Sequence, residues 1–333
     1  MAKSKTCCIL VCFVCLLLTA GCWDSKSIED RGFIVGVALD IADAGENTPL
    51  GSNNLALTVQ FIVPGGYATS QSSGGSGATP KAYKNITGTG DSVFSIAHQM
   101  DTKTSKQPYF EHIKVVLVSE EILKHDELFA SIMDVFIREP EMRRGVDVLV
   151  TKGEAKKYLA FDAHEGQQIP AIYISKILEN TLQSKRTIHP VRLGKMHEYL
   201  LGSSSFAVPV ASMEKNNIDI SGVAVFHGHN NKFIGMMNAN ETTGLNLVTG
   251  NMKYGGVEFK INNRLMNFEI LDSKSKLKVD ASNPQQVNIQ VDIKLEGRIE
   301  EMYGDKRLLN ENYIAAMEKK FQVKLNPLWR NLS

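Results

Sequence analysis

The residue whose chemistry the sequence defines best is Cys22. A basic start with Lys3 and Lys5 precedes an uncharged apolar run over 7–18. Small residues then lead into Cys22, which is the pattern of an export signal. The apolar run is shorter than the roughly 20 residues that span a bilayer. A thiol at this place can form a thioether to diacylglycerol before cleavage on its N-terminal side. We therefore predict a signal peptide over 1–21 and a lipid on Cys22.

An ordinary secretory signal cut elsewhere, or an uncleaved anchor, is the alternative for this segment. Lipoprotein signals favour Leu three residues before the cysteine, and here Thr19 occupies that position. Two acyl chains, at about 0.8 kcal/mol per buried CH₂, would hold a soluble domain on a membrane almost indefinitely. We therefore expect residues 22–31 to tether the mature protein to a membrane without embedding it.

A second set of charged side chains lies in the run Arg138-Glu-Pro-Glu-Met-Arg-Arg-Gly145. Arginine presents a bidentate fork to carboxylates and phosphates, so Arg138, Arg143 and Arg144 are candidate contacts for a partner or for an anionic lipid head. The alternative is a helix end followed by a salt-bridged turn, and it is the favoured interpretation.

Two further patterns suggest ligand sites but are better explained by structure. Gly88 and Gly90 precede a helical pattern as in a phosphate-binding loop, but Asp91 would repel an anion there, so we expect Asp91 to cap an amphipathic helix. His227 and His229 could share a strand face as metal ligands, yet no third ligand is near, so a polar hairpin tip is favoured. No hydrolase elbow, zinc-protease pair, phosphate loop or dinucleotide fingerprint is present, so we predict neither an enzyme nor a cofactor.

The composition limits the classes of protein to which this chain can belong. Loss of Lys3 and Lys5 with the leader changes the net charge from +1 to −1, which argues against a nucleic-acid partner. All five cysteines lie at or before Cys22, so the mature chain has no disulfide and must rely on packed cores. The chain has 333 residues. A single hydrophobic core rarely supports so long a chain, so we expect two or three domains.

The elements that would position these residues alternate between strands and helices. Buried strands are predicted at 32–40, 55–63, 113–119 and 146–151, with helices between and after them. Downstream, a hairpin over 223–237 and consecutive strands over 255–300 are predicted, followed by a helix whose apolar face carries Leu309, Tyr313, Met317 and Phe321. The fold class expected is α+β, with sheet-centred domains flanked by helices and mostly antiparallel or mixed sheets.

The predicted domain organisation follows from these elements. An N-terminal α+β domain spans 32–201 and includes a Ser- and Gly-rich loop over 67–81. A linker follows at 202–206. A C-terminal α+β region covers 207–333, with subdomains over about 207–254 and 255–333.

Several stretches together resemble the Ger(x)C family, the lipoprotein C subunit of bacterial spore germinant receptors. The similar residues are Gly21-Cys-Trp-Asp24, Ile34 to Asp40, Gly88 to Met100, His112 to Ser119, Phe136 to Arg144, Gly222 to Phe226, Phe233 to Met237 and Glu241 to Gly244. The resemblance covers most of the chain, from the signal to about residue 300.

The resemblance implies a non-enzymatic, lipid-anchored subunit on the outer face of the inner spore membrane or on the cell membrane. It would work with two integral-membrane receptor subunits and help to trigger germination in response to nutrients. Cys22, through its diacylglyceryl group, is the functional residue that carries over. Family members continue past a helix like 309–322 through further strands, whereas this chain stops at Ser333, so we expect a C-terminally truncated member.

Two other functions remain open from the residues themselves. A lipid-anchored solute-binding protein of an importer would show two α/β lobes around a hinged cleft. An envelope hydrolase would bring acids and bases together from distant parts of the chain.

Overall fold

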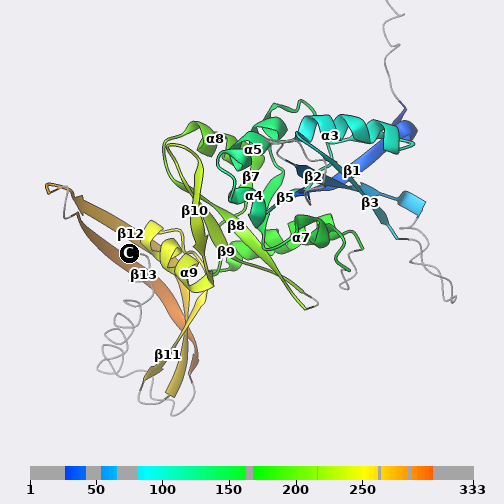
Figure 1. Cartoon of the computed structure of the whole chain (residues 1–333). Helices are drawn as coiled ribbons and strands as arrows, with labels where there is room; N and C mark the ends of the chain where they lie inside the picture. Colours follow the sequence, from blue (N-terminus) through cyan, green and yellow to red (C-terminus); the bar gives the residue numbers. More distant parts are fainter. Residues whose placement is uncertain are drawn as a thin grey trace, which may run out of the picture.

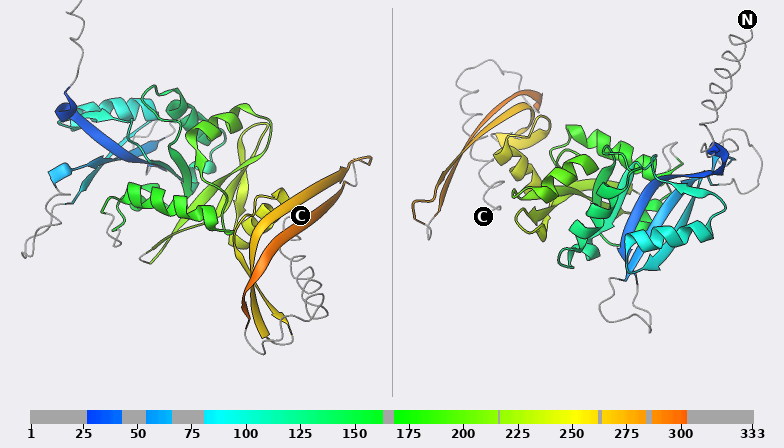
Figure 2. Two further views of the ribbon diagram at one scale, coloured as in Figure 1. Left: turned by 180° about the vertical axis from the view of Figure 1, so that it is seen from behind. Right: turned by 90° about the horizontal axis from the view of Figure 1, so that it is seen from above.

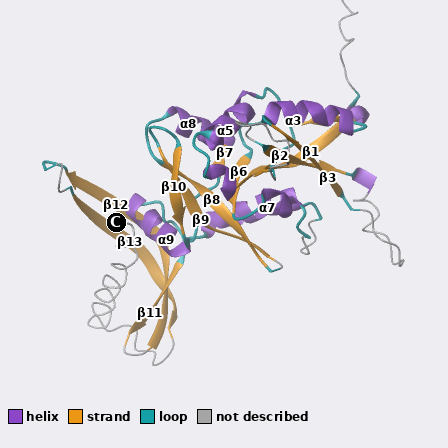
Figure 3. Ribbon diagram, in the orientation of Figure 1, coloured by secondary structure: helices purple, strands orange, loops and turns teal. Residues whose placement is uncertain are grey.

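The computed structural model describes residues 27–42, 54–65, 81–162, 168–215, 217–261, 264–283 and 287–302. Cys22, the predicted loop apart from Lys81, and the predicted helix over 309–322 lie outside these ranges. Within them, a large mixed sheet and a small antiparallel sheet combine with helices (Figures 1 and 3), so the predicted α+β class is confirmed.

The large sheet has ten strands, and its main path runs β10-β9-β8-β6-β5-β1-β2-β3. β1, β5, β6 and β8 form a parallel centre, while β2–β3 and β9–β10 add antiparallel strands at the two edges. β4 pairs in parallel with the start of β1, and β7 pairs with β6. The strands are β1 (Arg31–Ile41), β2 (Leu55–Ile62), β3 (Tyr83–Gly90), β4 (Gln107–Tyr109), β5 (Val115–Ser119), β6 (Asp147–Thr151), β7 (Val191–Arg192), β8 (Phe206–Glu214), β9 (Asn217–His227) and β10 (Lys232–Met237).

The central strands are continuous apolar runs because both faces of the sheet are covered. Every residue of β5 and β6 is buried, which is the pattern of parallel strands between two helical layers. The helices are α3 (Val93–Met100), α4 (Glu120–Leu123), α5 (Leu128–Arg138), α6 (Ala155–Leu159), α7 (Pro170–Asn180), α8 (Leu193–Leu201) and α9 (Ala239–Thr249).

The two helical layers build two separate hydrophobic cores. Helices α3, α4, α5 and α8 cover one face, where Ile96, Ile132 and Met196 join the core. Helices α6 and α7 cover the other face, where Leu159 and Ile174 do so. The views in Figures 1 and 2 show these layers on opposite sides of the sheet.

The C-terminal unit has its own small core and its own sheet. Strands β11 (Gly256–Ile261), β12 (Arg264–Asp280) and β13 (Asn288–Met302) form an antiparallel sheet, and α9 lies against it. Leu247 of α9 packs with Ile270 of β12 in this core. The long β12–β13 hairpin extends away from the large sheet (Figure 2).

Most predicted elements are present, with one correction. The strands at the four predicted places, the 223–237 hairpin and the consecutive strands after 255 are all observed. The helix after Gly90 is capped by Ser92, whose Oγ accepts a hydrogen bond from the Ser95 N–H at 3.2 Å, so the predicted cap Asp91 was wrong. The serine takes this role because it stands directly before the first helical residue.

The predicted domain boundaries stay a prediction. The segment 202–206 runs from the end of α8 to the first residue of β8, and β8 and the two strands after it continue the large sheet. Only the strands from Gly256 onward form a separate sheet among the described residues.

Candidate functional site at the charged turn and the junction of the two sheets

The predicted lipid site lies just before the described part of the chain. The first described element is the short 3₁₀ helix Ile28–Asp30, which leads directly into β1. Of the helices that the structure describes, none combines the length and the apolar character needed to cross a bilayer.

The three candidate arginines follow α5 or lie in its last turn, and they do not converge on one point. Arg138 Nε donates a hydrogen bond to Asp134 Oδ2 at 2.6 Å, one turn earlier in α5. The Arg143 guanidinium donates to Glu111 Oε1 at 2.8 Å, in the turn after β4. The carbonyl oxygen of Arg144 accepts a hydrogen bond from the Gly194 N–H at 2.9 Å, at the start of α8.

These ion pairs engage two of the three arginine side chains. The hydrogen bond to Asp134 raises the pKa of Arg138, and the hydrogen bond from Arg143 lowers the pKa of Glu111. Both pairs are largely exposed, and exposed pairs contribute about 0–1 kcal/mol, so an anion could compete for them at small cost. Recognition of a partner by these arginines remains a prediction.

The second candidate region is the junction where α9 meets the segment 184–189, which lies between α7 and β7 in the sequence. The side chain of Asn246 is buried, and its Nδ2 donates hydrogen bonds to the carbonyl oxygens of Thr187 at 2.8 Å and Lys185 at 3.2 Å. Thr243 Oγ1 also donates to the carbonyl of Lys185. On the other side of segment 184–189, the Gly222 N–H of β9 donates to the Arg186 carbonyl at 2.7 Å.

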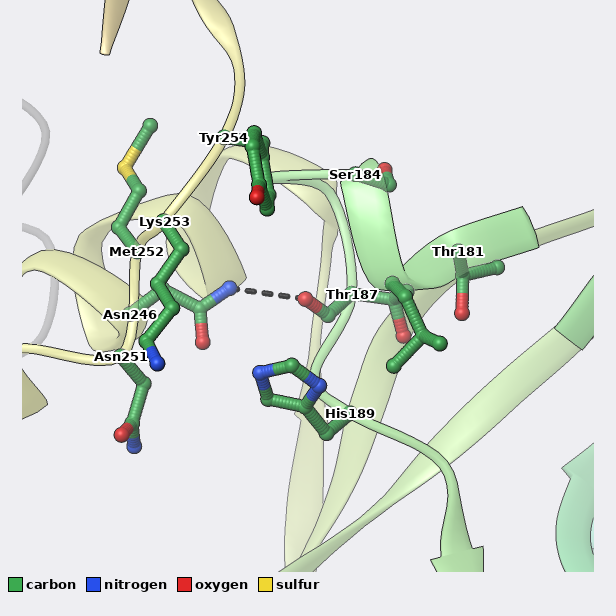
Figure 4. A pocket seen from close by; sticks show the side chains of 10 residues that line it. Thr181, Ser184, Thr187, His189, Asn246, Asn251, Met252, Lys253 and Tyr254 are labelled. Carbon is green, nitrogen blue, oxygen red and sulfur yellow. Dashed lines mark hydrogen bonds between the residues drawn. The ribbon is translucent and has the colours of Figure 1, made fainter. Parts of the chain in front are cut away.

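Figure 4 shows this junction from close by, with Asn246 directed at Thr187 and with His189, Lys253 and Tyr254 around them. The cavity enclosed here is only about 10 Å³. Because one water molecule already needs about that much space, this cavity has no room for an organic ligand.

A larger cleft of about 520 Å³ opens beside the junction, between α8, the strands β8–β10 and α9. Its walls are mostly apolar and include Phe206, Val225 and Leu245. The rings of Tyr199 and Phe206 stack at 5.1 Å between centroids. Lys195 Nζ lies 2.6 Å from a carboxylate oxygen of Glu198.

Lys195 of this cleft forms an ion pair with Glu198 of the same helix. The hydrogen bond to Glu198 raises the pKa of Lys195, and the same hydrogen bond lowers the pKa of Glu198, so both stay charged at neutral pH. A general acid or base needs a pKa near the working pH. By this criterion, Lys195 and Glu198 are not suited to act as a general acid or base.

Sequence reasoning missed the polar groups of this junction. Thr187 and Asn246 look like ordinary surface residues in the sequence, because their partners are backbone carbonyls brought close only by folding. One signal was available, since Asn238 and Glu241 have the spacing of a capping box and form one at the start of α9.

Of the two histidines of the predicted hairpin tip, His227 ends β9 and His229 lies in the turn before β10. The His229 N–H donates a hydrogen bond to His227 Nδ1 at 3.3 Å. Across the described ranges, no group of three His, Cys, Asp or Glu side chains is arranged to hold a metal ion.

Comparison with known proteins covers both halves of the chain. Residues 24–213 match the family described as "Spore germination protein N-terminal domain", and residues 221–328 match "Spore germination B3/GerAC like, C-terminal". Spore germination protein YndF of Bacillus subtilis (strain 168) is 30% identical, over 93% of this chain and 79% of its own length. Spore germination protein A3 of the same organism is 27% identical, over 88% of this chain and 74% of its own length.

A solved structure has the same fold. The crystal structure of the GerBC protein superposes with a TM-score of 0.53 at 22% identity, covering 89% of this chain and 80% of that chain. The family matches together span most of the sequence, including the stretches around Phe136 and Gly222 on which the resemblance rested. The chain is therefore a member of the Ger(x)C family of spore germination proteins, and its role lies in germination.

Proposed function

We propose that this chain is a lipid-anchored, non-enzymatic subunit of a nutrient germinant receptor that helps to trigger spore germination. The anchor would be a diacylglyceryl group on Cys22. It would hold the protein on the outer face of the inner spore membrane or on the cell membrane, beside two integral-membrane receptor subunits.

The observation that carries this proposal is the position of Cys22 relative to the family match. The match begins at residue 24, two residues after Cys22, which directly follows the predicted signal peptide over 1–21. The first described helix begins at Ile28, six residues after Cys22. Six residues span at most about 20 Å, so a lipid on Cys22 would keep the start of β1 close to the bilayer.

Such an anchor has a clear physical use for a binding subunit. Confinement to one membrane raises the effective concentration of the protein near membrane-embedded partners, so weak contacts suffice for assembly. The junction cleft and the charged turn offer contact surfaces, and the pKa values of Lys195 and Glu198 do not favour proton transfer.

The importer alternative is not supported by the fold. A solute-binding protein needs two similar α/β lobes around a hinge. The described residues instead form one ten-stranded mixed sheet and one three-stranded antiparallel sheet.

The substitution Cys22→Ala tests the proposal. We expect the variant to lose incorporation of radiolabelled fatty acid, to leave the membrane pellet and to weaken the germination response of spores that depend on this protein. Cys15→Ala is the matched control, because it changes a cysteine inside the apolar run and leaves the processing site intact. Unchanged labelling and pelleting of Cys22→Ala would contradict the anchor, and a normal germination response would contradict the receptor role.

A further inference from the structure

A groove of about 270 Å³ lies between α3 and α5, on the face of the large sheet that α3, α4, α5 and α8 cover. Its floor is apolar and includes Val37 of β1 and Leu57 of β2, with Phe136 of α5 at its side. Pockets that enclose drug-sized ligands measure roughly 300–1,000 Å³. The smaller volume here suits one or two anchoring side chains of a bound polypeptide segment.

The rim of this groove carries three carboxylates, Asp101, Glu139 and Glu141. Their recorded contacts are weak: Glu139 Oε1 and Glu141 Oε2 each accept a backbone N–H at 3.5 Å, and Asp101 Oδ2 is 4.0 Å from His98 Nδ1. Within the described residues, none of the three forms an ion pair with a lysine or arginine. The rim therefore presents negative charge that the described part of the chain does not neutralise.

Two of the three arginines of the same turn already pair with acids other than those of the rim. Arg138 is engaged by Asp134 and Arg143 by Glu111, so the acids Glu139 and Glu141 are the members of the turn that line the groove. This arrangement reverses the chemistry expected from the sequence, because it favours a cationic partner at the groove.

The α3 side of the rim, which also carries Asp101, adds exposed apolar surface. The side chain of Phe94 in α3 is 66% exposed, and its ring stacks on His98 at 5.8 Å between centroids. An exposed aromatic ring beside an apolar floor is the composition of a protein contact site, since aromatic residues are enriched in interface cores. Acidic and apolar groups together select a segment that carries both apolar and basic residues.

The groove also lies near the predicted membrane anchor. Gln107 and Pro108 of β4 line it, and they pair with Arg31 and Gly32 at the start of β1. With a lipid on Cys22, this end of the sheet would be the one held close to the bilayer. The closeness of the groove to the bilayer rests on the proposed function, because it assumes the lipid on Cys22.

We propose that the α3–α5 groove docks a basic amphipathic segment of a membrane-embedded partner subunit. An apolar side chain of that segment enters between the two helices, and its lysine or arginine side chains contact the carboxylates of Asp101, Glu139 and Glu141. Charge complementarity and closeness to the anchor distinguish this occupant from a lipid surface or a second copy of the chain.

The test uses photocrosslinking in the full chain, expressed in sporulating cells. Benzoylphenylalanine replaces Phe94 at the groove, and in a control variant it replaces Ile234, an equally exposed apolar residue (61%) on β10. We expect crosslinks from position 94 to a segment of an integral-membrane protein that contains lysine or arginine next to apolar residues. Position 234 should not crosslink to that segment.

A charge variant gives the second measurement. The triple variant Asp101→Asn, Glu139→Gln, Glu141→Gln should lower the position-94 crosslink yield by about fivefold or more, since three exposed ion pairs are lost. Glu214→Gln, another exposed acid outside the groove, should not change it. Thermal melting checks that all variants fold.

Several outcomes would overturn the inference. Crosslinks from position 94 to lipid, to a second copy of this chain, or to a segment without basic residues would each exclude the proposed occupant, as would an undiminished yield in the triple variant. These results would leave the Cys22→Ala experiment unaffected. Failure of the receptor proposal would instead show as normal anchoring and germination in Cys22→Ala, so the two failures are distinguishable.

Discussion

The carboxylate of Asp40, at the end of β1, caps helix α6 across 115 residues of sequence: its Oδ1 accepts a hydrogen bond from the Ala155 N–H at 2.6 Å. Asp40 Oδ2 accepts a second bond, from the Lys156 N–H at 2.9 Å. The residue before the helix, Glu154, makes no side-chain cap bond of its own. A buried strand residue thus supplies the acceptor that the first N–H groups of α6 need.

Replacement of Asp40 by alanine should therefore destabilise the protein. Asp40 is 4% exposed, so the change leaves two backbone N–H groups without a partner, at a cost of about 1–3 kcal/mol. Urea denaturation followed by circular dichroism measures this, with the exposed Glu214→Gln as a control expected within about 0.5 kcal/mol of the parent. Equal midpoints for Asp40→Ala and the parent would show that the cap is not needed.

Gly222 should be intolerant of any side chain. It lies in β9 with a φ of +79°, and an added Cβ would come 2.5 Å from the carbonyl oxygen of Met237. Both the left-handed backbone and the clash disfavour alanine, so we expect Gly222→Ala to lower stability by about 2 kcal/mol or more.

Gly235 provides the matched control for this substitution. It lies in the neighbouring strand β10, and an added Cβ there has no atom within 4 Å. Gly235→Ala should leave the unfolding midpoint nearly unchanged in the same assay. If the two variants behaved alike, the close approach of β9 to Met237 would not be a determinant of stability.

Asn246 should hold α9 of the C-terminal unit against the segment 184–189. Asn246→Ala removes the two donors to the Lys185 and Thr187 carbonyls, and each lost hydrogen bond to a buried group costs about 1 kcal/mol or more. We expect faster amide hydrogen exchange in 184–189 and in α9, while the amides of the buried strand β5 keep their protection. Thr249→Ala is the control, because its hydroxyl bonds only within α9 and the adjoining turn.

The sequence predicts a buried strand such as β5, but it does not predict the distant partners of Asp40 and Asn246. Apolar runs such as 113–119 predict buried strands directly, because burial on both faces leaves a local signature. Gln60 stands inside such a run, yet its Oε1 accepts the Ala171 N–H and its Nε2 donates to the Leu159 carbonyl, about 100 residues away. These pairings depend on which helices cover the sheet, and no local pattern encodes that.

The charged turn illustrates the same limit for function. The sequence places Arg138, Glu139 and Glu141 together. In the folded protein Arg138 pairs with Asp134, whereas Glu139 and Glu141 line the groove beside α3, so a partner at the groove meets negative charge. The basic members are conspicuous in the sequence, whereas the acids become candidates only once the groove is seen.

Asp147, the first residue of β6, should make stability depend on pH between about 4 and 6. It is 7% exposed, and burial raises its pKa to about 6, although Ser175 Oγ donates a hydrogen bond to it at 3.2 Å and Arg192 Nε lies 3.9 Å away. In this range the folded protein binds more protons at Asp147 than the unfolded chain does. The contribution of Asp147 to stability is therefore greatest below the unfolded pKa and decreases as the pH rises to about 6.

Asp147→Asn isolates this effect, because asparagine keeps an acceptor for Ser175 and does not titrate. Subtraction of the free energies of unfolding of the two proteins removes the contributions of all other groups. The difference should change by about 1–3 kcal/mol in favour of Asp147→Asn between pH 4 and pH 7, mostly below pH 6, and should be constant above pH 7. A difference that does not change between pH 4 and 7.5 would mean that the Asp147 carboxylate is solvated well enough to keep an ordinary pKa.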